Sequence, residues 1–113
     1  MTSIDSGLYI QTNVNGIDAN FIVDSGASVT IVSYETYDAI PSSSQPEIQA
    51  TRHVLTLTDG KTLETKGSTI FEFRVREKII KHEACVAAIR GSGILGLDFM
   101  IEHKWSSHQK WSS

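Results

Sequence analysis

The residues best suited to chemistry are an aspartate and the small residues after it, in the stretch NFIVDSGASVTIVS at positions 20–33. Asp24 stands between two apolar runs, FIV and VTIV, that both read as buried β-strands. A carboxylate held between two strands on a glycine-shaped loop is suited to activating water. The tripeptide Asp-Ser-Gly that begins at Asp24 can also form an ordinary turn, in which the carboxylate accepts backbone hydrogen bonds. The small residues of this loop are Ser25, Gly26, Ala27 and Ser28.

Length, composition and charge limit the class of protein. The 113 residues are 40% hydrophobic, which fits a single compact domain with a modest core. Ten basic and thirteen acidic residues give a net charge of −3 without a basic stripe, so neither nucleic acid nor a membrane surface is an expected partner. No apolar run approaches the roughly 20 residues of a membrane span, and the N-terminus does not resemble a signal peptide. We therefore expect a cytoplasmic protein.

The elements around Asp24 are predicted from periodicity and turn residues. Residues 7–24 alternate between polar and apolar around Asn15-Gly16, a dipeptide typical of a two-residue hairpin turn. Residues 34–40 predict a helical turn that stops at Pro41. The polar segment after it reads as a connecting loop.

The second half of the chain also predicts strands. Residues 53–76 form the clearest hairpin, a long two-stranded finger that turns at Asp59-Gly60. Residues 78–89, KIIKHEACVAAI, predict a further strand with its apolar residues at 86–89, and the stretch REKIIK at 76–81 reads as a solvated turn between strands. A short helix is expected within 97–103. Mostly strand with two short helical pieces predicts an all-β fold, a small closed barrel.

Two of these stretches together resemble one protein family. FIVDSGASVTIV, followed about seventy residues later by GILGLDFM, resembles the retropepsins, the aspartic proteases of retroviruses and long-terminal-repeat retrotransposons. The resemblance covers about Leu8 to Lys104. It implies one retropepsin-like domain over 1–113, with its core at about 8–104 and a tail at 105–113. The implied fold has a flap hairpin and one short C-terminal helix.

The resemblance also implies a mechanism that needs two chains. Two adjacent carboxylates that share one proton can activate water and protonate the leaving amine. The longer motif FIVDSGA occurs once in the sequence, around Asp24, so the resemblance implies that the pair comes from Asp24 of each copy in a homodimer. No cofactor and no metal are expected.

By resemblance, further residues take supporting roles around a bound peptide. The Ser25 hydroxyl would hydrogen-bond across the dimer axis, and Gly26 would leave room for substrate. An extended peptide would lie as an added β-strand over the loop floor and under the flap tip. The residues implied to contact the peptide are Ala27, Ser28, Thr58, Asp59, Gly60 and Ile94.

The chain departs from the family pattern at two places. Many viral members have an acidic residue at the position of Ser28 and an arginine at that of Leu97, and these two form an ion pair that is absent here as a unit. The tail KWSSHQKWSS is also atypical, although the family's termini supply much of the dimer interface. Trp105 is its candidate interface anchor.

Histidine and cysteine residues do not suggest a metal site. His82 and Cys85 are spaced like two ligands, but they and the remaining candidates, His103 and His108, fall in unrelated segments. Cys85 is expected in the core. The sequence therefore predicts an aspartic endopeptidase that processes a polyprotein. Two alternatives stay open: a non-catalytic dimerisation or peptide-binding module, and the protease-like domain of a larger cellular regulator.

Overall fold

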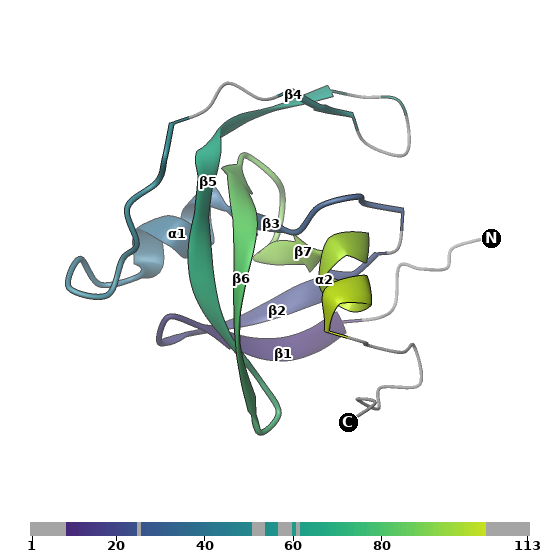
Figure 1. Cartoon of the computed structure of the whole chain (residues 1–113). Helices are drawn as coiled ribbons and strands as arrows, with labels where there is room; N and C mark the ends of the chain where they lie inside the picture. Colours follow the sequence, from purple (N-terminus) through teal and green to yellow (C-terminus); the bar gives the residue numbers. More distant parts are fainter. Residues whose placement is uncertain (1–8, 25, 51–53, 57–59, 61, 104–113) are drawn as a thin grey trace.

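The computed structural model describes residues 9–24, 26–50, 54–56, 60 and 62–103, which contain seven strands and two short helices (Figure 1). The helices are α1 (Tyr34–Ala39) and α2 (Leu97–Glu102). The strands are β1 (Tyr9–Val14), β2 (Ile17–Val23), β3 (Ile31–Ser33), β4 (Val54–Thr56), β5 (Thr62–Val75), β6 (Lys78–Ala87) and β7 (Gly93–Leu95).

The strands close into a barrel. They form one sheet in the order β1-β2-β7-β3-β6-β5-β4, and a further pairing between β1 and β5 joins the ends of the ring, leaving β4 outside it. Most neighbours are antiparallel, but β2 runs parallel to β7 and β3 parallel to β6. This arrangement confirms the predicted closed all-β fold.

The first hairpin turns where the sequence predicted. Val14 pairs with Ile17, and the two residues between them, Asn15 and Gly16, have φ angles of 49° and 98°. Positive φ at both central positions is the type I′ geometry that Asn-Gly favours, because asparagine tolerates and glycine readily adopts that backbone conformation.

Four phenylalanines fill the barrel. Phe73 of β5 contacts Phe21 of β2 edge-on at 5.8 Å and Phe99 of α2 at 5.6 Å between ring centroids. Phe71 completes the group, and all four are fully buried. Burying a side chain of this size contributes about 1.5–3 kcal/mol, so these contacts from both halves of the sequence hold the ring and α2 together.

The predicted hairpin at 53–76 is present but is not a long two-stranded finger. β4 and β5 share only three pairs, from Val54↔Glu64 to Thr56↔Thr62. From Thr65 onward β5 pairs with β6 instead. A bulge interrupts this pairing between Thr65 and Gly67, and φ at Gly67 is 145°. A finger of that length cannot form because the barrel needs the rest of β5 as one of its walls.

The predicted turn at 76–81 is shorter than expected. Only Arg76 and Glu77 lie in the turn, and β6 begins at Lys78 and ends at Ala87, before the expected apolar end at 89. A strand was predicted here, over 78–89, but its alternation before residue 86 was missed because a histidine occupies one of its inward positions. The buried alternate positions of β6 are Ile80, His82, Ala84 and Val86.

Both helices lie where helical turns were predicted. α1 begins after Ser33, whose hydroxyl accepts a hydrogen bond from the Thr36 amide and so caps the helix. α2 follows Gly96 and ends at Glu102. Within the described part of the chain, neither helix has the length and apolar character needed to cross a bilayer.

Candidate active site

Asp24 sits at the point where β2 leaves the barrel. Val23, the last residue of β2, pairs with Leu95 of β7, and the Asp24 amide donates to the Leu95 carbonyl at 3.1 Å. The Asp24 side chain is half-buried, so its carboxylate meets solvent from a fixed backbone position. The parallel pairing of β2 with β7 therefore positions the candidate catalytic residue.

The residues after Asp24 form a tight turn around its carboxylate. The Gly26 amide donates to Asp24 Oδ1 at 2.9 Å, and the Ala27 amide donates to the Asp24 carbonyl at 3.1 Å. Ser25 lies outside the described residues, so its implied bond across a dimer axis stays a prediction. The candidate catalytic loop is thus also an ordinary Asp-Ser-Gly turn, in which a backbone donor orients the carboxylate.

Helix α2 is hydrogen-bonded to this loop. The Leu97 amide donates to the Ala27 carbonyl at 2.7 Å, and the Asp98 amide donates to the Ser28 carbonyl at 3.2 Å. The Thr30 hydroxyl adds a side-chain bond to Asp98 Oδ1 at 2.8 Å. In this chain, backbone hydrogen bonds therefore join residues 27 and 28 of the loop to residues 97 and 98 of α2.

Gly96 allows this close approach between loop and helix. A Cβ atom added at Gly96 would overlap the backbone of Ala27 and Val29. The Gly96 amide also donates to Thr30 Oγ1 at 3.1 Å. Only a residue without a side chain lets β7 pass directly beneath the Asp24 loop.

The other predicted substrate contacts are described only in part. Ala27 is buried and Ser28 exposed on the Asp24 loop, and Ile94 is half-buried on β7 between β2 and β3. Gly60 is exposed in the connection between β4 and β5. Thr58 and Asp59 lie outside the described residues. Contact of these six residues with a peptide stays a prediction.

Cys85 is only half-buried, rather than a core residue as expected. It lines a hollow of about 270 Å³ together with Val29, Thr30 and Asp98. Burial raises the pKa of the Cys85 thiol, and the charges of Glu83 and Asp98 raise it further. Since the thiolate is the reactive form, Cys85 is poorly suited to act as a nucleophile at neutral pH.

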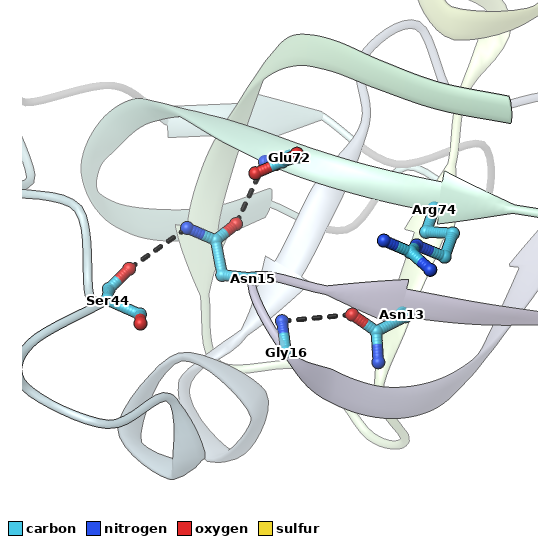
Figure 2. A pocket seen from close by; sticks show the side chains of 6 residues that line it. All are labelled: Asn13, Asn15, Gly16, Ser44, Glu72 and Arg74. Carbon is cyan, nitrogen blue, oxygen red and sulfur yellow. Dashed lines mark hydrogen bonds between the residues drawn. The ribbon is translucent and has the colours of Figure 1, made fainter.

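A second, polar hollow of about 390 Å³ lies at the tip of the first hairpin (Figure 2). Asn15 donates to the Ser44 carbonyl at 3.0 Å and accepts from the Glu72 amide at 2.8 Å, while the Gly16 amide donates to Asn13 Oδ1 at 2.9 Å. These bonds join the hairpin to β5 and to the loop after α1. Their arrangement is that of a structural anchor.

Sequence spacing did not indicate a histidine pair that the fold creates. His82 on β6 and His103 after α2 were assigned to unrelated segments, yet His82 Nδ1 lies 3.0 Å from His103 Nε2. The inward position of His82 in an alternating strand was the available signal. It was missed because the alternation of the predicted strand before residue 86 was not recognised.

Comparisons with known proteins agree with this geometry. A family model described as aspartyl protease matches residues 10–99. The EIAV protease in complex with the inhibitor HBY-793 has a similar structure, with a TM-score of 0.70 and 20% identity over 100% of this chain and 99% of that one.

Two cellular proteins are also similar in structure. The retroviral protease-like domain of Ddi1 from Leishmania major has a TM-score of 0.68 and 20% identity over 86% of this chain and 77% of its own. A retropepsin-like aspartic protease from Rickettsia conorii has a TM-score of 0.55 and 19% identity over 85% and 69%. Since the family model spans most of the sequence and these structures share the closed barrel, the chain belongs to the aspartyl protease family and has the retropepsin-like fold.

Proposed function

We propose that this protein is an aspartic endopeptidase whose active site forms between two copies of the chain. The observation that carries the proposal is the position of Asp24, a half-buried carboxylate on a loop that is hydrogen-bonded to β7 and α2. Each chain contributes one loop with the motif FIVDSGA. A homodimer would place two such carboxylates on its twofold axis.

In this mechanism the two Asp24 side chains share one proton. The ionised carboxylate takes a proton from water, and the water oxygen attacks the carbonyl carbon of the peptide while the protonated partner donates to the carbonyl oxygen. The tetrahedral intermediate then collapses, its C–N bond breaks, and the amine leaves with a proton from the pair. One water and one peptide bond become one carboxyl group and one amine.

The substrate would be an extended peptide. It would pair as a strand above Ala27 and Ser28, with Ile94 forming an apolar subsite wall and the β4–β5 hairpin acting as the flap. The inhibitor complex of the structurally similar EIAV protease supports a ligand-binding role for this fold. We infer that the natural substrate is a polyprotein of a retrovirus-like element and that cleavage takes place in the cytoplasm.

A second candidate is favoured by one comparison. The Ddi1 domain of Leishmania major is described as protease-like and matches this chain about as well as the viral enzyme does. This similarity supports a role as the protease-like domain of a larger cellular protein. Cleavage of a polyprotein reporter would favour the first candidate. Lack of any peptidase activity would favour a protease-like domain that acts only as a binding module.

The decisive variant is Asp24→Asn. The amide keeps an oxygen that can accept from the Gly26 amide, so the fold should persist, but it cannot take a proton from water. We expect turnover of a peptide library to fall by about 10²–10⁴-fold. Asp38→Asn, at an exposed position on α1, is the matched control and should retain full activity. Wild-type turnover by Asp24→Asn would disprove the assignment.

A further inference from the structure

Three potential metal ligands meet where the end of α2 packs on β6. His82 projects from β6, while Glu102 and His103 lie at the C-terminal end of α2. One ligand atom from each lies within 4.8 Å of the others. His82 Nδ1 is 3.0 Å from His103 Nε2 and 3.5 Å from Glu102 Oε1.

Two of these separations are close to those between ligand atoms in a tetrahedral metal centre. Zinc binds imidazole nitrogen and carboxylate oxygen at about 2.0–2.2 Å, which places neighbouring ligand atoms about 3.3–3.5 Å apart. The two measured edges, 3.0 and 3.5 Å, lie close to that range. Small side-chain rotations would therefore suffice to seat an ion, and Glu102 has the freedom to move because its side chain is 65% exposed.

Asp98 orients the central histidine. Its Oδ2 lies 3.1 Å from His82 Nε2, while its Oδ1 is held by the Thr30 hydroxyl at 2.8 Å. A carboxylate on the far nitrogen keeps the proton of the neutral ring on Nε2, which leaves the Nδ1 lone pair directed at His103 and Glu102. Carboxylate, histidine and metal are commonly arranged in this way.

A hydrogen bond between the two rings explains only part of the cluster. It accounts for the 3.0 Å distance if His103 donates to His82, whereas the Glu102 oxygen 3.5 Å away has a proton to accept only if both nitrogens of His82 carry one. A cation between the three atoms satisfies all of them without that second proton. Two carboxylates, Asp98 and Glu102, would balance its double charge.

Packing holds the central histidine in place. The His82 side chain is 4% exposed and packs against Phe99, with 5.2 Å between ring centroids.

We propose that His82 Nδ1, His103 Nε2 and Glu102 Oε1 bind one zinc ion or a chemically similar divalent transition metal, with the fourth position open to water. Two imidazoles favour such ions over magnesium or calcium, which prefer oxygen ligands. The metal would fasten the end of α2 to β6. Because α2 is hydrogen-bonded to the Asp24 loop, the metal would also stabilise that loop, without contacting substrate. This proposal is independent of peptidase activity.

The test is calorimetric titration of ZnCl₂ into the metal-free, untagged full chain. We expect saturable binding of one ion per chain and a melting temperature that rises with zinc concentration. Co²⁺ should give the visible absorption of a tetrahedral site, and excess Mg²⁺ should displace neither Co²⁺ nor Zn²⁺ from the protein. Absence of saturable binding, or displacement by Mg²⁺, would overturn the proposal.

Variants locate the site. His82 is buried and its replacement endangers folding, so the informative changes are His103→Gln and Glu102→Gln at the more exposed positions, with folding checked by circular dichroism. Each should weaken zinc binding by about a hundredfold, and Asp98→Asn by about 10–100-fold. His53→Gln, which removes a histidine elsewhere in the sequence, should bind like wild type. Wild-type affinity in both ligand variants would place any bound zinc elsewhere and disprove the assignment.

Discussion

Asn15 combines a left-handed backbone conformation with bonds to two distant segments. Its φ angle is 49°, and its amide group bonds to the Ser44 carbonyl and the Glu72 amide (Figure 2). A residue here must tolerate positive φ and also carry a donor and an acceptor. Asparagine meets both requirements, whereas glycine meets only the first.

Substitution at Asn15 separates these two contributions. Asn15→Gly keeps the backbone conformation but loses both side-chain bonds, so we expect unfolding in urea to show a loss of about 1–2 kcal/mol. Asn15→Ala also strains the backbone and should lose about 1–2 kcal/mol more. Equal stability of the two variants would show that the positive φ carries no cost at this turn.

At the scale of elements, the junction of β7 and α2 decides the shape of the active-site loop. Gly96 lies between β7 and α2, against the backbone of Ala27 and Val29. Hydrogen bonds from α2 to Ala27 and Ser28 require that the two segments stay in contact. A shift at this junction would therefore reach the proposed catalytic residue, Asp24, without any change in Asp24 itself.

Gly96→Ala should test this coupling. The new methyl group must displace the loop, so we expect a loss of stability of about 1–3 kcal/mol and a fall in kcat. Ser92→Ala is the control, because Ser92 bonds to the Ser33 amide and the Thr36 hydroxyl through its backbone carbonyl, which the substitution keeps. An alanine variant with wild-type stability and kcat would show that the loop does not depend on this close approach.

For the whole molecule, the central question is assembly, because one chain holds one Asp24 loop. The sequence suggests that the tail beginning near Trp105 contributes to the dimer interface, but residues 104–113 lie outside those described. The hypothesis of a shared active site can nevertheless be tested through activity. A half-site on each monomer makes catalysis depend on protein concentration.

Two measurements follow from the dimer hypothesis. Specific activity should fall on dilution below the dimer dissociation constant, with sedimentation showing monomers over the same range. Excess Asp24→Asn protein should suppress wild-type activity by forming mixed dimers with one carboxylate, whereas excess of a heat-unfolded chain should not. Constant specific activity at all concentrations, with no suppression, would mean that a single chain is the active unit.

Local chemistry by itself determined much of this protein. The Asn15-Gly16 turn, the Asp24 loop between two apolar strands and the helix after Gly96 were all predictable, because each depends on neighbouring residues and on the period of the side chains. The family resemblance rests on the same short stretches. These parts of the fold agree with the prediction.

Only the tertiary structure decided how distant segments meet. Pairing of β1 with β5 closes the barrel, the bond from Thr30 to Asp98 spans 68 residues, and His82 meets His103 across 21. No local pattern encodes such contacts, since they depend on which strand ends and helix ends the closed ring brings together. The alternation of β6 was obscured for the same reason. Histidine is a poor signal of an inward position until Asp98 and His103 are known to surround it.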